Sequence, residues 1–513
     1  MTAETQRDVV DYLMEPSTHG GAPVERIDTH SAIVFLAGSR ALKLKRAVRF
    51  DYLDFSTEPL RKAACEAEFR INRRSAPSIY RGVVAVTRHV DGSLALDGQG
   101  APVDWLVDMV RFDQEGLFDR LASRNALDLA LMHPLAIAVA RFHGSADRRG
   151  DHGGRAGMQW VVDGNAAGFA EQGAGILDPD LCAELTGKAS AEIRRLGDLL
   201  DERRVKGLVR QCHGDLHLRN IVLLDGQPML FDAVEFNDDI ACIDVLYDIA
   251  FLVMDLWRRR LESHANAVLG GYLAETGDFS GLALLPLFLS CRAAVRAKTS
   301  ATAAGVQPDR AKARELQDLA REYLVMARDL LEPAPARLLA IGGFSGSGKS
   351  TLARALAPAI GPVPGAVVVR SDEVRKALRG VPTLQRLGPD GYTAEVTERV
   401  YRTVEDRVAQ VLRAGHSAIA DAVFAKPSHR LAIEQVAVAN ATPFVGVWLE
   451  APPDVLMART EARGPDASDA GASIVRRQIT QDPGPMTWHR LDAGGVPGSV
   501  AERALVLATK PFP

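Results

Sequence analysis

The chain has 513 residues, of which 47% are hydrophobic and 25% are charged. These values are typical of a folded globular protein of two or three domains, and they exclude a disordered, fibrous or low-complexity chain. The net charge of −4 is unevenly distributed, because residues 337–513 carry 21 Lys+Arg and 17 Asp+Glu (net +4) while the first 336 carry 40 and 48 (net −8), an imbalance too mild to indicate a nucleic-acid partner.

The first predicted elements are a small antiparallel sheet and one helix. Hydrophobic alternation on both sides of the turn Gly38-Ser39 predicts two paired strands, and Pro59 fits the first turn of a helix. The predicted strands are 32–37, 40–46, 83–88 and 105–111, and the predicted helix runs from about residue 56 to residue 74. The pattern then turns helical from residue 117 to about residue 331, interrupted by an apolar strand pair at 220–224 and 228–232.

The loop that enters this strand pair carries the first catalytic motif. It reads His213-Gly214-Asp215-Leu216-His217-Leu218-Arg219-Asn220. Asp215 and Asn220 have the spacing of a kinase catalytic loop, in which the aspartate accepts the proton of the attacking hydroxyl and the asparagine holds Mg²⁺. Asp232, after the second strand, occupies the position of the second metal-binding aspartate. We interpret His217 as a partner that stabilises the loop by hydrogen bonding.

The string His-Gly-Asp-Leu-His-x-x-Asn resembles the aminoglycoside phosphotransferase and choline kinase family over roughly residues 23–331. The resemblance implies a protein-kinase-like α+β fold, with an N-lobe at about 23–111 and a C-lobe at about 112–331, that phosphorylates hydroxyls of small molecules. It assigns Asp215 as the catalytic base and Asn220 and Asp232 as metal ligands. The glycine-rich loop of protein kinases is replaced by Thr29-His30-Ser31.

Lys43 fits the strand lysine that binds the α- and β-phosphates of ATP in kinases, with Glu68 in the following helix as its ion-pair partner. Lys45 and Glu66 are the alternatives. Lys45 shares a strand face with Lys43, and Glu66 lies half a turn from Glu68.

The segment Glu332-Pro333-Ala334-Pro335-Ala336 is the predicted linker between domains 1–331 and 337–513, because proline excludes helix at the preceding residue. After it, an apolar strand at 338–341 leads into a loop that satisfies G-x-x-x-x-G-K-[ST] and opens a helix. In such a loop the backbone N–H groups, the lysine and the serine bind ATP phosphates and Mg²⁺. The predicted cofactor-binding residues of this loop are Gly343, Ser345, Gly346, Ser347, Gly348, Lys349, Ser350 and Thr351.

Three more short apolar strands, at 367–369, 418–420 and 444–449, alternate with helical stretches and predict a parallel, doubly wound α/β sheet. Asp372 follows the first of them and would orient or deprotonate an acceptor hydroxyl. Asp421 ends the second and would hold Mg²⁺ or its water, with a helix N-cap as the alternative.

Arg459 and Arg463 stand four residues apart, which predicts one helix face before the loop 464–469. Together with Lys349, Ser350 and Asp372 they resemble the gluconate kinase, zeta toxin and polynucleotide kinase group over roughly residues 337–510. In that group the lid arginines neutralise transition-state charge. An ordinary solvated helix face is the alternative.

The whole chain resembles bacterial fusions of an aminoglycoside-phosphotransferase-like domain with a P-loop kinase-like ATPase. The resemblance implies a bifunctional phosphotransferase that uses ATP and Mg²⁺ in each domain and acts on hydroxyls of small molecules, such as a sugar or aminosugar. Two alternatives stay open: an ATP-binding regulatory protein with one inactive domain, and a polynucleotide 5′-kinase activity of the P-loop half. The sequence identifies neither acceptor and does not predict the oligomeric state.

The cysteines and the apolar segments bear on localisation. The five cysteines are scattered without a C-x-x-C pair, so neither a disulfide framework nor a zinc site is indicated. The N-terminus lacks a basic region followed by an apolar stretch. The most apolar helical stretch, 243–257, contains three aspartates and is too short to span a bilayer, so we interpret it as a core helix. We expect a cytoplasmic protein without a membrane partner.

Overall fold

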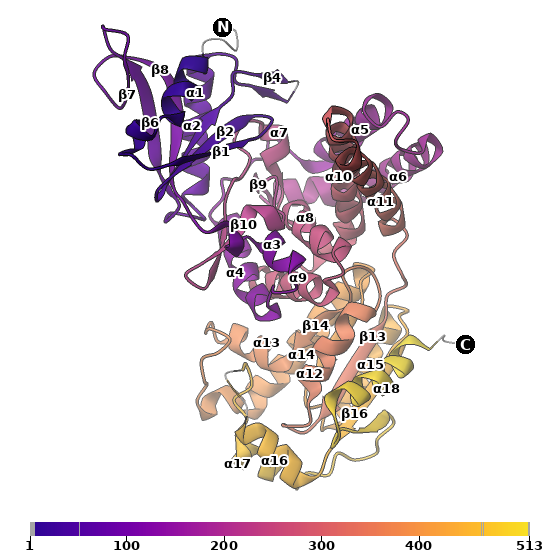
Figure 1. Ribbon diagram of the computed structural model, residues 1–513. Coiled ribbons are helices and arrows are strands. Elements are labelled where there is room, and N and C mark those ends of the chain that lie inside the picture. The colour runs from indigo at the N-terminus through magenta and orange to yellow at the C-terminus, as the bar shows by residue number, and fades with distance from the viewer. Residues whose placement is uncertain (1–5, 51, 463, 465, 511–513) are drawn as a thin grey trace. The chain divides into compact units, whose positions relative to one another are not determined.

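The computed structural model describes residues 6–50, 52–462, 464 and 466–510. Its tertiary contacts divide the chain into two compact units, which are described separately (Figure 1). Unit 1 comprises Met1–Glu171 and Thr186–Asp255, and unit 2 comprises Gln172–Leu185 and Leu256–Pro513. Unit 2 thus includes helices before residue 331 that the sequence analysis assigned to the N-terminal domain. The functional boundary at 332–336 stays a prediction.

Unit 1 begins with a six-stranded antiparallel sheet in the order β1-β2-β3-β8-β6-β7. One face packs on a helix, with Phe35, Leu42 and Leu44 in that core. Because side chains alternate along a strand, Lys43 and Lys45 lie on the opposite face, which a second helix covers. The elements are α1 (Arg7–Met14), β1 (Val24–Asp28), β2 (Ala32–Ala37), β3 (Arg40–Lys45), α2 (Glu58–Asn72), β6 (Tyr80–Arg88), β7 (Leu94–Leu96) and β8 (Ala101–Val110).

The four predicted strands and the predicted helix are confirmed, with β6 and β8 each beginning earlier than expected. Helix α1 and strand β7 have no counterpart among the predictions. A short hairpin, β4 (Arg49–Phe50) with β5 (Leu53–Asp54), follows β3.

The rest of unit 1 is mainly helical, and it contains the predicted strand pair of the catalytic motif. These strands, β10 (Ile221–Leu224) and β11 (Gln227–Leu230), pair antiparallel. The turn between them, Asp225-Gly226, has φ angles of 50° and 73°, which matches the two-residue turn that favours this dipeptide. The other elements are α3 (Phe118–Ser123), α4 (Met132–Gly144), α5 (Gly154–Glu171), α6 (Pro179–Val205), β9 (Val209–Gln211), α7 (Asp238–Ala241), β12 (Cys242–Asp244) and α8 (Val245–Arg258), of which α6 and α8 extend into unit 2.

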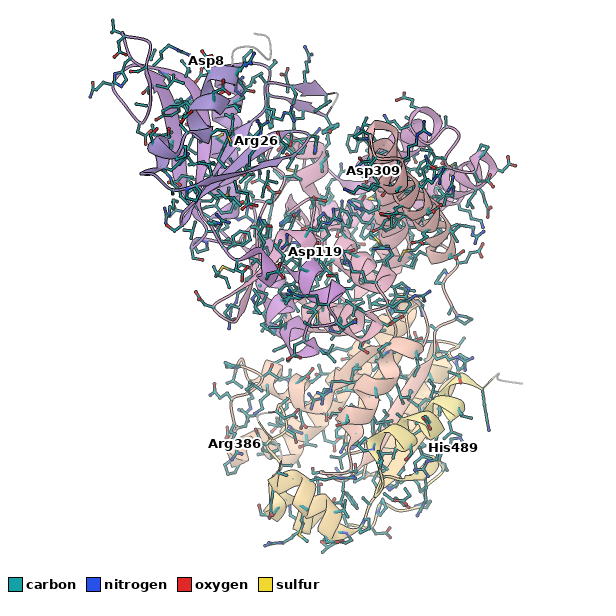
Figure 2. The ribbon with its side chains drawn as sticks, viewed as in Figure 1. Asp8, Arg26, Asp119, Asp309, Arg386 and His489 are labelled. Atoms are coloured by element: carbon teal, nitrogen blue, oxygen red, sulfur yellow. The ribbon has the colours of Figure 1, made fainter. Side chains whose placement is uncertain are left out.

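Unit 2 begins with three helices, α9 (Glu262–Thr276), α10 (Leu285–Val306) and α11 (Arg310–Leu330). Asp309 caps α11 by accepting hydrogen bonds from two backbone N–H groups of its first turn (Figure 2). The Asn266 side chain of α9 donates to the carbonyls of Pro364 at 3.2 Å and Ala366 at 3.0 Å. This contact with the segment that leads into the P-loop sheet is one reason why unit 2 includes these helices.

One helical stretch among the described residues, Ser280–Val306, is long and apolar enough to cross a membrane, with a mean hydropathy of 1.3. In the structure, 72% of the apolar part of this stretch is buried, as expected for a core helix. The sequence analysis had singled out residues 243–257 instead.

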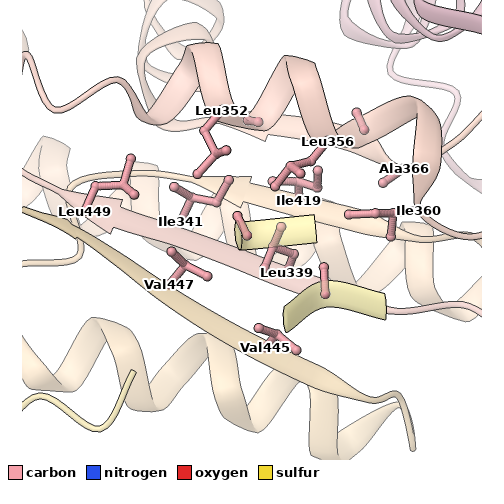
Figure 3. Packing of buried hydrophobic residues seen from close by; sticks show 14 of the residues in the cluster. Leu339, Ile341, Leu352, Leu356, Ile360, Ala366, Ile419, Val445, Val447 and Leu449 are labelled. Atoms are coloured by element: carbon pink, nitrogen blue, oxygen red, sulfur yellow. The ribbon is translucent and has the colours of Figure 1, made fainter. Parts of the chain in front are cut away.

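The remainder of unit 2 is built on a five-stranded parallel sheet in the order β14-β15-β13-β16-β17, as the strand–helix alternation predicted. Ile341, Ile419 and Val447 of this sheet pack against Leu352 and Leu356 of the helix after the P-loop (Figure 3). The strands are β13 (Leu338–Gly343), β14 (Val367–Arg370), β15 (Ala418–Asp421), β16 (Phe444–Glu450) and β17 (His489–Asp492). The helices are α12 (Lys349–Leu356), α13 (Ser371–Leu378), α14 (Ala394–Arg413), α15 (Pro427–Ala439), α16 (Pro453–Glu461), α17 (Ala472–Gln478) and α18 (Pro497–Thr509).

Strand β17 was not predicted, because its sequence His-Arg-Leu-Asp is a polar edge strand without an apolar run. The register places Arg370 beside Asp421, and Asp421 beside Ile341 of the strand that precedes the P-loop. The parallel sheet therefore gathers the ends of β13, β14 and β15 at one edge, where ligands bind in folds of this kind.

Candidate active sites

The loop that carries Asp215 is held by a buried aspartate, Asp248 of α8. Its two carboxylate oxygens accept hydrogen bonds from the backbone N–H groups of His213 and Gly214, each at 2.9 Å. Gly214 has a φ of 80°, and a Cβ atom there would lie 3.1 Å from the Val234 side chain. Glycine at this position thus meets a backbone requirement, and Asp248 fixes the start of the motif.

Two further aspartates of the same apolar segment hold the surroundings of the loop. Asp255 accepts a hydrogen bond from the N–H of Leu218 at 3.1 Å. Asp244 accepts two from the buried Arg203 guanidinium, at 2.7 and 2.8 Å. Buried carboxylates require such partners. Aspartates within an apolar segment were therefore the sequence signal that could have identified these residues.

Asp215 and Asn220 are brought together as their spacing predicted. The Asn220 Nδ2 donates to the backbone oxygen of Asp215 at 2.9 Å and to its Oδ2 at 3.1 Å. The Asp215 side chain remains 42% exposed, so an acceptor hydroxyl has access to it. His217 Nε2 lies 3.2 Å from the same carboxylate, while its Nδ1 accepts from the N–H of Arg219 at 3.2 Å. These contacts confirm His217 as a hydrogen-bond partner within the loop.

His213 is fully buried, and burial lowers the pKa of its imidazole although Asp248 opposes the shift. Its Nε2 lies 2.9 Å from the carbonyl oxygen of Phe231. A neutral ring that donates there ties the catalytic loop to the residue before Asp232.

Five charged side chains form one ion-pair network, which consists of Lys43, Lys45, Glu68, Asp232 and Glu235. The backbone of Asp232 has a φ of 61°. Lys43 Nζ lies 2.9 Å from Glu68 Oε1 and 2.5 Å from Asp232 Oδ1. Lys45 Nζ contacts the other oxygen of Glu68 and the carboxylate of Glu235. The buried Glu68 is therefore held by two lysines, of which Lys43 also reaches the predicted metal ligand.

Lys43 and Asp232 stay charged despite their burial. Burial opposes the charged form of Lys43, but the carboxylates of Asp232 and Glu68 outweigh it and hold the lysine pKa well above its usual value. Burial likewise opposes ionised Asp232, yet the Lys43 ammonium keeps the pKa of that carboxyl below its usual range. Burial raises the pKa of Glu235, against the attraction of Lys45.

The structure forms the expected ion pair between Lys43 and Glu68, whereas Glu66 is an exposed residue 4.0 Å from Lys62. Lys45, the alternative lysine, belongs to the same network through Glu68. Glu235 had no counterpart among the predicted site residues, because its partner Lys45 is 190 residues away in the chain.

The glycine loop between β13 and α12 has the backbone expected of a phosphate cradle. Gly346 has a φ of 85°, and a Cβ atom there would lie 2.3 Å from the carbonyl oxygen of Leu456, so the loop passes close to α16. Lys349 Nζ donates to the carbonyl oxygen of Phe344 at 3.1 Å. The buried Ser347 Oγ has no hydrogen-bond partner among the described residues, and a phosphate oxygen would satisfy it.

The remaining predicted residues of this loop are accounted for as follows. Gly343 and Gly348 have φ angles of 137° and 91°, which favour glycine. The N–H of Ser345 donates to Gln478 Oε1 of α17 at 2.8 Å, a contact that was not predicted. Thr351 is exposed on the first turn of α12.

A hydroxyl and a carboxylate meet at the edge of the parallel sheet. Ser350 Oγ donates to Asp421 Oδ2 at 2.6 Å, and Arg370 Nε lies 3.4 Å from the same oxygen. Burial raises the pKa of the half-buried Asp372, as does Asp421 nearby, while Arg370 and Lys349 oppose the shift. Asp372 and Lys349 are thus close enough to influence each other, as a shared site requires.

Helix α16 ends at Glu461, so the structure describes only Arg459 of the two predicted arginines. Arg459 donates to the carbonyl oxygens of Ala493 at 2.7 Å and Gly495 at 3.2 Å, so it holds the loop after β17. Arg463 lies outside the described residues. The roles of Arg459 and Arg463 in charge neutralisation stay predictions.

The segment after position 465 is fastened instead by two aspartates that the sequence analysis did not select. Asp466 Oδ1 accepts from Arg370 at 2.8 Å. Asp469 accepts from the buried Lys376 at 2.7 Å and from the hydroxyl of Tyr392 at 2.6 Å.

Both sites offer the oxygen donors that Mg²⁺ prefers. In unit 1 these are the Asn220 amide and the Asp232 carboxylate, and in unit 2 they are the Ser350 hydroxyl and the Asp421 carboxylate. The residues present therefore fit a divalent metal in each unit.

Comparison with family models matches residues 59–285 to the phosphotransferase enzyme family and residues 338–481 to an AAA domain. Uncharacterized proteins of Mycobacterium tuberculosis and Mycobacterium bovis are each 31% identical over 480 residues, which span 91% of this chain and 92% of theirs. An adenylyl-sulfate kinase of Myxococcus xanthus is 34% identical over 123 residues, 24% of this chain and 62% of that protein.

Two solved structures are similar to separate parts of the chain. A choline/ethanolamine kinase family protein from Mesorhizobium loti is 12% identical, with 64% of this chain and 99% of that chain covered and a TM-score of 0.36. A gluconokinase from Sinorhizobium meliloti is 21% identical, with 34% and 91% covered and a TM-score of 0.26.

Proposed function

This chain belongs to the family of the mycobacterial proteins named above and is an ATP-dependent kinase, and we propose that it is bifunctional, with one site in its phosphotransferase domain and one in its P-loop domain. Each unit would transfer the γ-phosphate of ATP to a hydroxyl of a small molecule, such as a sugar or an aminosugar. The observation that supports two sites is that each unit brings together its own charged set, Asp215 with Asn220 in one and Ser350 with Asp421 in the other. We also propose a cytoplasmic location.

In the N-terminal site, the exposed carboxylate of Asp215 takes the proton of the acceptor hydroxyl as its oxygen attacks the γ-phosphorus. The bond from phosphorus to the ADP oxygen breaks as the new bond forms. Lys43, held by Glu68, would bind the α- and β-phosphates, and Asn220 and Asp232 would hold Mg²⁺, which would supply neutralising charge for the phosphates.

In the C-terminal site, the loop 343–350 binds the phosphates through its backbone N–H groups, and Lys349 contacts the β- and γ-phosphates. Ser350 and Asp421 would hold the metal. Asp372 serves as the base for the second acceptor, since it lies in the first turn of α13, directly after β14, at the ligand-binding edge of the sheet.

The test is an untargeted screen in which the full chain, ATP and a metabolite extract are incubated and compounds that gain one phosphate are identified by mass spectrometry. Asp215→Asn should lower one product roughly 100-fold while ATP binding persists, and Lys349→Ala should remove a different product. If both variants affect the same single product, or if one affects none, bifunctionality is wrong and one domain is regulatory. Phosphorylation of an oligonucleotide 5′ end instead would identify a polynucleotide kinase.

A further inference from the structure

A ladder of aromatic rings runs outward from the ion-pair network of unit 1. It consists of Phe55, Phe236, Tyr52, Phe50 and His30, each of which contacts the next. The centroid distances are 6.4 Å for Phe55 to Phe236, 6.1 Å for Phe236 to Tyr52, 5.7 Å for Tyr52 to Phe50 and 6.2 Å for Phe50 to His30.

The inner end of the ladder adjoins the residues of the proposed N-terminal site. Lys45 Nζ lies 5.3 Å from the centroid of the buried Phe55 ring, and the same ammonium contacts Glu68 and Glu235. Phe236 follows Glu235 directly and lies four residues after Asp232. Asp232, the predicted metal ligand, and Phe236, one of the rings of the ladder, therefore belong to the same short segment.

The outer end of the ladder is open to solvent. Tyr52 and Phe50, on the β4–β5 hairpin, are 41% and 40% exposed, and His30 on the β1–β2 turn is also exposed. The hairpin is tied to the metal-ligand segment, because Asn237 Nδ2 donates to the carbonyl oxygen of Tyr52 at 3.2 Å. The rings are thus arranged by the fold rather than scattered singly on a surface.

The geometry favours a flat ring as the ligand. The Phe50 and Tyr52 rings are stacked with an angle of 13° between their planes and both are partly exposed, so a flat ring can pack against their exposed surface. Two described carboxylates of neighbouring strands are already engaged: Asp28 at the end of β1 pairs with Arg26, and Asp54 of β5 accepts from Ser56. A cationic group finds no uncommitted carboxylate among them.

We propose that this ladder binds an aromatic or heteroaromatic ring of the acceptor of the N-terminal site. The proposal rests on the phosphotransferase function given above and narrows its substrate class to hydroxylated compounds with a flat ring. The site lies on the N-lobe hairpin formed by β4 and β5, beside the segment that follows Asp232.

The test compares binding of naphthyl β-glucoside and methyl β-glucoside to the full chain by calorimetry, in the presence of a non-hydrolysable ATP analogue. Wild-type protein should bind the naphthyl compound about 10-fold more tightly. The double variant Phe50→Leu/Tyr52→Leu keeps apolar side chains without flat faces, so it should lose this preference. Val90→Ala, which alters a fully exposed apolar residue between β6 and β7, is the control and should retain it.

Equal binding of the two glucosides by wild type, or an unchanged preference in the double variant, would overturn the proposal. So would ladder-dependent binding of choline or of a single-stranded oligonucleotide without any preference for the naphthyl compound. Phosphate transfer to the naphthyl compound is measured in parallel. Ladder-dependent binding without transfer supports the ring site and counts separately against the proposed phosphotransfer.

Discussion

Ser350 Oγ donates a hydrogen bond to Asp421 Oδ2 at 2.6 Å, although 71 residues separate them in the chain. The first belongs to the helix after the P-loop, and the second ends a neighbouring parallel strand. A hydroxyl and a carboxylate so placed form the oxygen pair to which we assign the metal of this site.

Asp421→Asn should therefore raise the Mg²⁺ concentration required for half-maximal ATP turnover about 10-fold, because the amide binds the cation more weakly than the carboxylate. The measurement is a Mg²⁺ titration in an Asp215→Asn background, which leaves only the P-loop site active. Glu450→Gln removes an exposed carboxylate at the end of strand β16 of the same sheet and serves as the control. Equal shifts in both variants would contradict the assignment.

A pH dependence follows from the raised pKa of Asp372. A base works only as the carboxylate, so turnover at the P-loop site should fall as pH decreases through the Asp372 pKa. Because burial and the nearby Asp421 raise that pKa, the fall should begin at a higher pH than for an ordinary aspartate. Asp372→Asn should give a low rate without this inflection, whereas Lys349→Ala should weaken ATP binding and turnover together. Unchanged acceptor phosphorylation by Asp372→Asn would show that another group is the base.

Removing Lys45 should destabilise unit 1, because it leaves the buried carboxylate of Glu68 with Lys43 alone and removes the ion-pair partner of the buried Glu235. Lys45→Met should lower the local stability of the α2 region by about 3 kcal/mol. Lys62→Met, which breaks the exposed pair with Glu66, should cost about 0.5 kcal/mol or less. Hydrogen exchange of α2 peptides measures both, and similar effects of the two variants would show that the network does not depend on Lys45.

The buried His416 should make unit 2 sensitive to acid. Burial lowers the pKa of its imidazole from 6.5 to about 4, while its Nε2 contacts the carbonyl oxygen of Gly365 at 2.9 Å. Between those pH values the unfolded chain binds a proton that the folded chain does not. Stability is therefore lost as pH falls from 6.5 to 4, by about 1.4 kcal/mol per pH unit.

His416→Gln should reduce this pH dependence even if it lowers stability at neutral pH. Urea unfolding followed by hydrogen exchange of β15 peptides at pH values on either side of 6.5 makes the comparison. A pH dependence that is the same in wild type and variant would show that other groups dominate.

The sequence by itself determined the parts that depend on near neighbours in the chain. The five-residue spacing of Asp215 and Asn220 places both in one short loop, and the glycines of 343–348 dictate a phosphate-binding turn before α12. Hydrophobic periodicity gave most strands and helices of both units, because burial of an apolar face requires that pattern. It missed β17, whose polar residues carry no such pattern.

Only the tertiary structure decided which distant charges meet. Lys43 reaches Asp232 across 189 residues, and Arg370 reaches Asp466 across 96. The aspartates of 243–257 read as interruptions of an apolar helix, yet they hold the catalytic loop. A buried charge requires a partner of opposite charge, and the tertiary structure determines which residue that is. The spacing of residues along the chain does not predict such a pair.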